Sequence, residues 1–178
     1  MITTTIIDDT GFERMLSRLA HEIVERNHER GRLAFVGLRT RGEFVAQRLH
    51  DRVSRILDTE CPFGVLDITL YRDDVREQLH QPELRATTIT FDITGCDVIL
   101  VDDVLFTGRT VRSALDALLA LGRPRSIQLV VIVDRGHREL PIRADFIGKP
   151  ITTSRGQEVR VRLTEVDGSD GIDLVTLD

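Results

Sequence analysis

The residues best suited to chemistry lie in a single run, Val98-Ile-Leu-Val-Asp-Asp-Val-Leu-Phe-Thr-Gly-Arg-Thr110. Four apolar residues lead into two adjacent carboxylates, Asp102 and Asp103, and a short loop, Thr107–Thr110, precedes a helical pattern. This order predicts a buried strand that brings two acids to its carboxyl end, followed by a loop at the start of a helix over 111–121. Unpaired amide groups and the helix dipole both favour an anion at such a place, so the loop predicts phosphate binding.

Carboxylates beside a phosphate loop narrow the ligand further. Such acids suit a molecule that also carries hydroxyl groups, which they can hold directly or through a hydrated Mg²⁺. A sugar phosphate meets this description. The alternative is an ordinary strand–turn–helix unit in which Asp102 and Asp103 merely cap the helix, but the full pattern is far more specific than an acid pair alone. It resembles the phosphoribosyl pyrophosphate (PRPP) signature of type I phosphoribosyltransferases.

Two further segments could complete such a site. The first, Gly37-Leu-Arg-Thr-Arg-Gly42, combines arginines, which supply donors for phosphate oxygens, with glycines, which let backbone approach an anion. We expect a pyrophosphate loop there, although a purely structural turn has the same pattern. The second is the polar stretch from Arg72 to Thr88, which predicts a mobile lid that brings Arg72 over a departing pyrophosphate. An ordinary exposed loop is the other interpretation of this stretch.

The composition is that of one ordinary globular domain. The chain has 178 residues, of which 41% are apolar and 30% charged, and its net charge is −5. No stretch approaches the length of a membrane span and the first residues lack the charged start of a signal peptide, so we expect a cytoplasmic protein. The net acidity gives no general sign of nucleic-acid binding. Cys61 and Cys96 have no partners at metal-ligand spacing, which favours free thiols over a disulfide or a zinc site.

Strand and helix patterns alternate through most of the chain, which predicts an α/β fold with a mostly parallel sheet flanked by helices. A capping box at Thr10–Glu13 predicts the start of a first helix that should end near Asn27. The other predicted elements, besides the signature strand and its helix, are strands at 33–37, 64–71, 89–93 and 126–133 and a helix at 44–56. Residues 1–178 should form a single domain. Its small cap, or hood, should come mainly from about 134–178, with a strand at 158–163, and should cover the carboxyl edge of the sheet beside a flexible lid loop.

Together with the PRPP signature, Gly37–Gly42, Asp67–Asp74 and Asp134–Lys149 resemble the PyrR family of bifunctional pyrimidine-operon regulators and uracil phosphoribosyltransferases. The resemblance covers nearly the whole chain and implies the type I phosphoribosyltransferase fold. It implies transfer of phosphoribosyl from PRPP to uracil, which gives UMP and pyrophosphate and uses Mg²⁺. It further implies binding of pyrimidine-operon mRNA under the control of UMP or UTP, commonly to promote transcription termination, and a dimer or larger homo-oligomer.

The resemblance also implies roles for individual residues. Asp102 and Asp103 would lie at the ribose hydroxyls, and Arg72 would act with them as a catalytic group. Any Mg²⁺ would be held mainly by PRPP and reached from the acids through water. The full set of expected substrate contacts is Thr40, Arg41, Val98, Ile99, Leu100, Val101, Asp102, Asp103, Val104, Leu105, Phe106, Thr107, Gly108, Arg109, Thr110, Asp134, Phe146 and Ile147.

The base would be recognised from the cap. Phe146 should stack on the pyrimidine, with backbone near Ile147 and the side chain of Asp134 at its polar edge, and the alternative for Phe146 is a core aromatic. A purine phosphoribosyltransferase is the nearest other enzyme, because Ala144–Gly148 also resembles the base-binding segment of hypoxanthine-guanine enzymes. Those enzymes have an acid where this chain has Phe106 and a lysine where it has Asp134, which counts against a purine.

RNA contacts are expected on a surface separate from the catalytic crevice. The resemblance assigns them to the first helix and the cap, at Ser17, His21, His137, Arg138, Arg143 and Lys149. Ser17 and His21 are four residues apart, so they share one helix face outside the apolar stripe. The sequence alone favours a solvated helix face and a charged rim, and only the family resemblance reverses that interpretation. A different class of function, a nucleotide-sensing RNA-binding regulator with little catalysis, also remains an alternative.

Overall fold

The computed structural model describes residues 1–29, 31–68, 87–154 and 156–177. These residues form a five-stranded sheet in the order β3-β2-β4-β5-β6 and a three-stranded sheet in the order β1-β8-β7. The elements are β1 (Ile2–Ile7), α1 (Asp9–Asn27), β2 (Leu33–Leu38), α2 (Arg41–Leu57), β3 (Phe63–Leu66), β4 (Asp97–Leu105), α3 (Arg109–Leu121), β5 (Ser126–Asp134), β6 (Phe146–Pro150), β7 (Gln157–Arg162), α4 (Thr164–Asp167) and β8 (Gly171–Thr176). Within the described ranges, no helix is long and apolar enough to cross a membrane.

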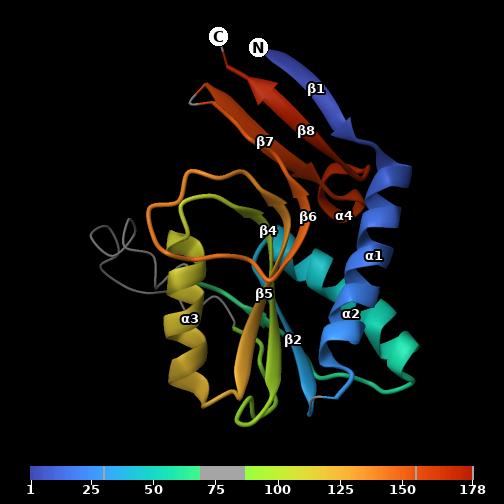
Figure 1. Cartoon of the computed structure of the whole chain (residues 1–178), viewed down its shortest axis with the longest axis vertical. Helices are drawn as coiled ribbons and strands as arrows, with labels where there is room; N and C mark the ends of the chain where they lie inside the picture. The colour runs from blue at the N-terminus through green and yellow to red at the C-terminus, as the bar shows by residue number, and fades with distance from the viewer. Residues whose placement is uncertain (30, 69–86, 155, 178) are drawn as a thin grey trace.

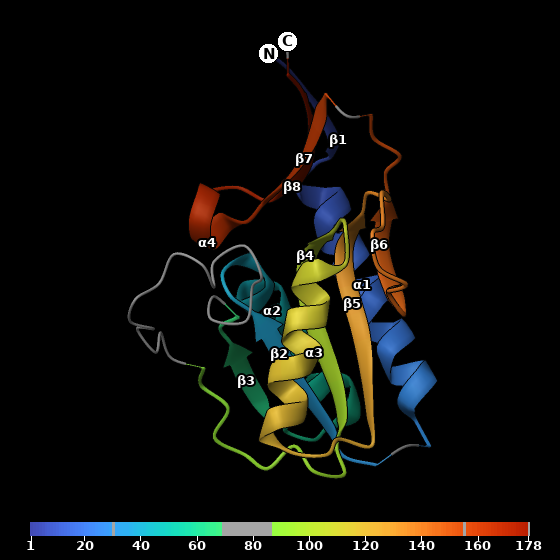
Figure 2. The same cartoon turned by 90° about the vertical axis from the view of Figure 1, so that its left-hand side faces the viewer.

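The five-stranded sheet is parallel and is covered by helices on both faces (Figures 1 and 2). Its central strand, β4, alternates between two cores: Ile99 and Val101 pack on the side of α1 and α2, and Val98 and Leu100 pack on the side of α3. This double burial explains why the middle of β4, Val98–Val101, is continuously apolar, as is usual for parallel strands between helices. The carboxyl ends of the strands meet at one edge, where open α/β sheets bind ligands.

The antiparallel sheet projects beyond that edge as a cap, with both chain termini at its far end (Figure 1). β8 lies in the middle of the cap and pairs with β7 on one side and with β1 on the other. The sequence patterns do not predict β1, because its partner lies at the opposite end of the chain. β6 falls within the stretch expected to form the cap, yet it pairs with β5 and extends the parallel sheet.

Ion pairs hold the cap against the start of α2. The guanidinium of Arg48 lies 2.5 Å from Glu165 and 2.7 Å from Asp170, and only 16% of the Arg48 side chain is exposed. Two turns earlier, Arg41 donates to the carboxylate of Asp167 over 2.8 Å and to the carbonyl of Val161 over 3.0 Å. The short helix α4 and the end of β7 are therefore fixed to α2, which itself packs on β4, the strand that carries both acids.

Two local predictions are wrong. The first helix is capped by Asp8 rather than by Thr10, because the Asp8 carboxylate accepts a hydrogen bond from the Gly11 amide over 2.8 Å. The helix therefore begins at Asp9, two residues earlier than the capping box predicts. Residues 89–93 form no strand: the described backbone makes one isolated bridge, between Val65 and Thr88, and then turns. The expected lid up to residue 86 lies outside the described residues, as does most of the later half of the strand predicted at 64–71.

We predict that Arg48→Gln lowers the free energy of unfolding by about 3 kcal/mol at pH 7, because Asp170 and Glu165 lose the partner of a largely buried pair. Burial would raise the pKa of Asp170, but hydrogen bonds from Arg48 and Thr164 outweigh it and lower that pKa. The hydrogen bond from Arg48 also lowers the pKa of Glu165. A lowered carboxyl pKa stabilises the fold above the unfolded-state value, and this contribution disappears as the pH falls through the folded-state value.

Urea unfolding of wild type and variant at several pH values measures this difference, which should shrink between about pH 5 and pH 3. Arg112→Gln is the matched control, since Arg112 pairs with Asp116 on an exposed helix face and such pairs contribute at most about 1 kcal/mol. Equal effects of the two substitutions, or a penalty that does not depend on pH, would contradict the assignment.

Candidate active site

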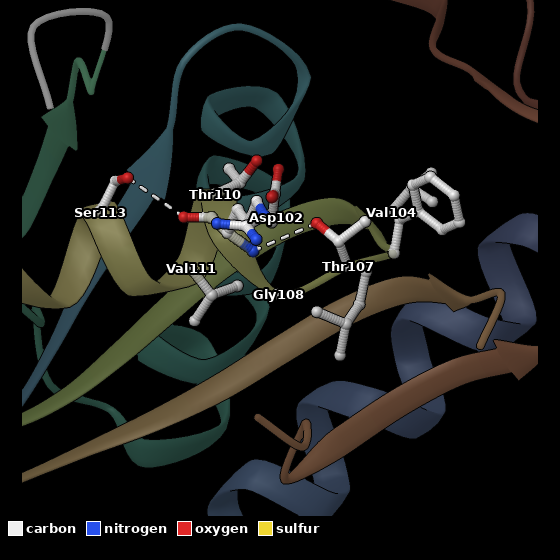
Figure 3. A pocket seen from close by; sticks show the side chains of 10 residues that line it. Asp102, Val104, Thr107, Gly108, Thr110, Val111 and Ser113 are labelled. Carbon is white, nitrogen blue, oxygen red and sulfur yellow. Dashed lines mark hydrogen bonds between the residues drawn. The ribbon is translucent and has the colours of Figure 1, made fainter. Parts of the chain in front are cut away.

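The main pocket opens at the carboxyl end of β4 and has a volume of about 530 Å³ (Figure 3). It lies where the strand passes through a short loop into α3. Its lining residues all come from this strand–loop–helix unit: Asp102, Val104, Leu105, Phe106, Thr107, Gly108, Arg109, Thr110, Val111 and Ser113. The pocket therefore forms around the segment that the sequence singled out for phosphate and hydroxyl binding.

The two adjacent acids face different hollows, because successive side chains of a strand point to opposite sides. Asp102 lines the main pocket, whereas Asp103 lines a second cleft of about 480 Å³ beneath the cap, together with Arg41 and Asp167. Each carboxylate accepts the next backbone amide, from Asp103 over 2.9 Å and from Val104 over 2.8 Å. A ligand held by both acids must therefore lie across the end of β4.

Asp102 carries an unfavourable charge. Its carboxyl is buried, and burial followed by the negative charge of Asp103 raises its pKa well above the usual value for an aspartate. Both causes act against the ionised form. A cation, or a substrate centre that gains positive charge, would relieve this repulsion. The acid pair is thus poised for a ligand of that kind.

The loop before α3 has the geometry of an anion site. Gly108 has a φ of 92°, a left-handed conformation that favours glycine, and an added Cβ would lie 3.3 Å from Ile142. The residue before α3, Gly108, has no side chain to cap the helix, so the amides that follow Arg109 and the helix dipole are available to a ligand in the pocket. The Thr107 hydroxyl accepts from the Arg109 amide over 3.3 Å, which helps to fix the loop.

A second loop, from 136 to 142, holds this anion loop in place. The amides of Glu139 and Leu140 both donate to the Thr107 carbonyl, over 2.9 and 3.2 Å. The Glu139 carboxylate also accepts from the Arg109 guanidinium over 2.6 Å. The position of the phosphate loop therefore depends on backbone contacts from a segment thirty residues later in the chain.

The expected pyrophosphate loop starts α2 directly beside the acids. Thr40 is exposed at the helix start, and Arg41 reaches into the cleft beneath the cap. A Cβ on Gly42 would lie 2.6 Å from the Val101 carbonyl and 3.1 Å from Cα of Asp102. This glycine therefore serves a close approach of two protein backbones, rather than the approach of backbone to an anion that we expected.

The acids fit a magnesium ion that arrives with a phosphorylated ligand. No cluster of three or more histidine, cysteine, aspartate or glutamate side chains in the described chain could hold a metal by itself. Mg²⁺ commonly keeps several waters and binds through one or two carboxylates together with substrate phosphates. Asp102 and Asp103 supply that number of carboxylates. The donor set therefore matches a shared site and not a closed protein cage.

Several expected substrate contacts are wrong. The side chains of Val98, Ile99, Leu100 and Val101 are fully buried in the two cores, and their backbone pairs with β2 and β5, so they support the site without touching a ligand. Phe146 is also a core residue. It is only 5% exposed and packs on the side of α1, because the alternation of β6 turns it away from α3. Its neighbour Ile147 packs on the α3 side.

Asp134 and two of the proposed RNA contacts, His137 and Arg138, form hydrogen bonds with residues around the pocket. Arg138 donates to the Asp134 carboxylate over 2.5 Å and to the Phe106 carbonyl over 2.9 Å, with only 22% of its side chain exposed. His137 lies 2.7 Å from the Thr153 carbonyl and meets the Phe106 ring edge-on. The loop that carries these two residues folds onto the phosphate loop, although neither of them lines the pocket, and their contact with RNA stays a prediction.

The other proposed RNA contacts lie elsewhere. Ser17 and His21 line a groove between α1 and α2, with Nδ1 of His21 bonded to the Ser17 carbonyl over 2.8 Å. Arg143 and Lys149 are exposed at the two ends of the β6 segment. Arg72, the third expected catalytic residue, lies outside the described residues. The sequence analysis missed Val111 and Ser113 as pocket residues, although both follow the phosphate loop within one helical turn.

Comparison with known proteins gives the site a family. A model of the phosphoribosyl transferase domain matches residues 3–165. The "Bifunctional protein PyrR" of Pelotomaculum thermopropionicum is 54% identical over 167 residues, which cover 94% of this chain and 92% of the relative. The protein of the same name from Thermus aquaticus is 57% identical over 161 residues, which cover 90% and 89%.

Solved structures share the fold. The hypoxanthine phosphoribosyltransferase of Trypanosoma cruzi in complex with IMP aligns with a TM-score of 0.74 over 98% of this chain and 93% of that chain, at 16% identity. A hypoxanthine phosphoribosyltransferase of Staphylococcus aureus gives 0.71 over 98% and 92%, at 20% identity. These likenesses concern the fold alone, and they confirm the type I phosphoribosyltransferase architecture predicted from the sequence. The chain belongs to the phosphoribosyltransferase family and, within it, to the bifunctional PyrR proteins.

Proposed function

We propose that this chain transfers the phosphoribosyl group of PRPP to uracil, forming UMP and pyrophosphate, and that it also regulates pyrimidine-operon expression by binding mRNA. The observation that carries the catalytic half is the meeting of the buried Asp102 carboxylate with the glycine-led start of α3 in one pocket, while Asp103 faces the adjoining cleft beneath the cap. The identity of 52–57% with bifunctional relatives over most of the chain supports both halves. Such an enzyme would meet PRPP and transcripts in the cytoplasm, so this location is part of the proposal.

Different residues of the site would bind different groups of PRPP. The 5-phosphate would lie on Thr107–Thr110, where helix amides and the dipole favour an anion. Asp102 and Asp103 would hold the ribose hydroxyls across the end of β4, and Thr40 and Arg41 would face the pyrophosphate. Before Arg41 can do so, its contact with Asp167 has to rearrange or be shared.

Catalysis would come from position and charge. Rupture of the bond between C1 and the pyrophosphate oxygen leaves positive charge on the sugar, and the buried negative charge of the acid pair would stabilise that charge in a site of low dielectric. When bound, Mg²⁺ would neutralise charge on the departing pyrophosphate. The phosphate loop would keep the reacting carbon in place, which lowers the entropic part of the barrier. Arg72 remains a proposed contact to the pyrophosphate.

We predict that Asp102→Asn lowers UMP formation by about 100- to 1000-fold, because one pre-positioned charge at the reacting sugar is lost. The same substitution should not lower the melting temperature at pH 7. The pKa of Asp102 is raised by burial and by Asp103, so its ionisation opposes folding at neutral pH. This cost shrinks as the pH falls below the folded-state value and vanishes only below the unfolded-state value. The asparagine oxygen can still accept from the Asp103 amide.

A uracil-plus-PRPP assay and calorimetric melting at pH 7 and pH 4 test these two effects together. Asp116→Asn on the exposed face of α3 is the control and should change neither. Full activity in the Asp102 variant, or a large drop in its melting temperature, would remove Asp102 from the proposed mechanism.

We predict that uracil is used with a kcat/KM at least about tenfold above that for hypoxanthine or guanine. The two solved structures named above are hypoxanthine phosphoribosyltransferases, but they share with this chain only the fold and 16% and 20% sequence identity. Phe106 and Asp134 stand where the sequence resemblance places an acid and a lysine in purine enzymes. Steady-state assays with the three bases at saturating PRPP measure these kcat/KM values. A higher value for either purine would favour a purine phosphoribosyltransferase instead.

For RNA, we predict that Arg143→Gln with Lys149→Gln weakens binding of the organism's own pyrimidine-operon leader transcript and leaves UMP synthesis unchanged. Both side chains are exposed and lie outside the pocket, whereas Arg138 supports the phosphate loop and is unsuitable for such a test. The loss of two phosphate contacts should reduce the slope of log affinity against log salt by about 1.4. Filter binding over a salt series measures both quantities.

Arg123→Gln provides the matched control, because Arg123 is exposed in the connection between α3 and β5, at the opposite end of the sheet. It should alter neither activity. Should the wild-type protein bind a scrambled transcript as tightly as the leader, the regulatory half of the proposal would fail, and unchanged affinity in the double variant would exclude this surface only.

A further inference from the structure

One aromatic side chain lies open to solvent inside the main pocket. Phe106 follows the last residue of β4 and is 42% exposed, although large apolar side chains are usually buried. Of the large apolar side chains that are exposed in the described chain, it is the only aromatic one. It lines the pocket together with Val104 and the phosphate loop. An exposed aromatic ring in a polar, phosphate-binding pocket calls for a ligand with a flat face.

The ring is held in place from several sides. The Arg135 guanidinium carbon lies 4.1 Å from the centre of the Phe106 ring, and the His137 ring meets it edge-on at 6.0 Å between centroids. The Phe106 carbonyl accepts a hydrogen bond from Arg138 over 2.9 Å. Phe106 therefore has little freedom left to lose when a ligand binds, which favours affinity.

Arg135 is itself fixed by the cap. Its guanidinium donates to the Gln157 carbonyl over 2.9 Å and to the Thr153 hydroxyl over 3.3 Å, and its amide donates to the Leu105 carbonyl over 3.1 Å. These contacts keep the guanidinium over one face of the phenyl ring. The part of the ring that Arg135 and His137 leave uncovered is free to stack on a second planar group in the pocket.

We infer that Phe106, backed by Arg135, is the surface on which the base of the substrate stacks, and that it determines the preference for a pyrimidine. The inference rests on the proposed function, since it names the residue that selects the base. It replaces Phe146, which lies in the core on the other side of the sheet. Stacking of a base on an aromatic side chain contributes about 1–3 kcal/mol by alanine substitution, which corresponds to about 5- to 150-fold in affinity.

The chemistry of a phenyl ring explains a preference against purines. A pyrimidine such as uracil can direct its polar edge away from Phe106 and present only its face to the ring. The imidazole part of a purine adds a ring nitrogen that needs a partner, and a phenyl group offers neither a donor nor an acceptor. A buried polar group without a partner weakens binding by about 5- to 150-fold. Phe106 would thus bind the smaller base and exclude the larger one by leaving it unsatisfied.

The test compares Phe106→Tyr, Phe106→Leu and Phe106→Ala in steady-state assays with uracil and PRPP varied separately. We expect Phe106→Tyr to retain the wild-type KM for uracil, and Phe106→Leu and Phe106→Ala to raise it by about 10- to 100-fold, while the KM for PRPP changes less than about threefold. The ratio of kcat/KM for uracil to that for hypoxanthine should fall in the same order. Leu119→Ala, at an exposed apolar residue of α3 that does not line the pocket, is the control for surface truncation.

The leucine variant keeps an apolar group of similar size and guards against loss of folding in the alanine variant. A wild-type KM for uracil in Phe106→Leu would overturn the inference. So would a rise in the KM for PRPP as large as that for uracil, because the phosphate loop and not the base would then have been disturbed. Failure of the wild-type protein to use uracil at all would instead contradict the proposed function, so the two failures are distinguishable.

Discussion

The site depends on how closely the first turn of α2 approaches the end of β4. Gly42 makes this approach possible, because any side chain there would meet the Val101 carbonyl and the backbone of Asp102. The contact brings a loop with two arginines beside two carboxylates that are far away in sequence. The parallel register of β4 with β2 and β5 fixes where, along the strand direction, the loops that follow these strands begin. A substitution at Gly42 would therefore separate the two halves of the site before it affected either half's own chemistry.

The acid pair shows how function is maintained at a cost to stability. Burial and the neighbouring charge both raise the pKa of Asp102, so the ligand-free fold carries a repulsion that a structural residue would avoid. The cap compensates elsewhere, where Arg48 satisfies Glu165 and Asp170 in a largely buried network. The acids at the pocket repel each other, whereas the charged groups of the cap are paired. This arrangement suits electrostatic catalysis, because catalytic charges must be in place before the substrate arrives.

Local patterns were enough to predict four strands of the parallel sheet, its helices and the loop before α3, since apolar runs and helical spacing involve neighbouring residues. They were not enough for β1, a threonine-rich strand whose partner β8 lies at the other end of the chain. The same limit applies to Phe146 and Phe106. Which of two phenylalanines meets a ligand depends on which face of β6 turns toward α1 and on how far β4 continues, and both are set by tertiary packing.

The loop from 134 to 142 was expected to contribute to an independent RNA surface, and its contacts lead to a different interpretation. Its amides hold Thr107, Arg138 holds the carbonyl of Phe106, and Glu139 holds Arg109. His137 is bonded to Thr153 of the segment that leads into the cap. Any partner that moves this loop must also move the phosphate loop, and any ligand that orders the phosphate loop must restrict this one. Because linkage between two sites is reciprocal, contact of RNA with His137 or Arg138 and occupancy of the pocket would alter each other's affinity through these few hydrogen bonds, with no rearrangement of the sheet.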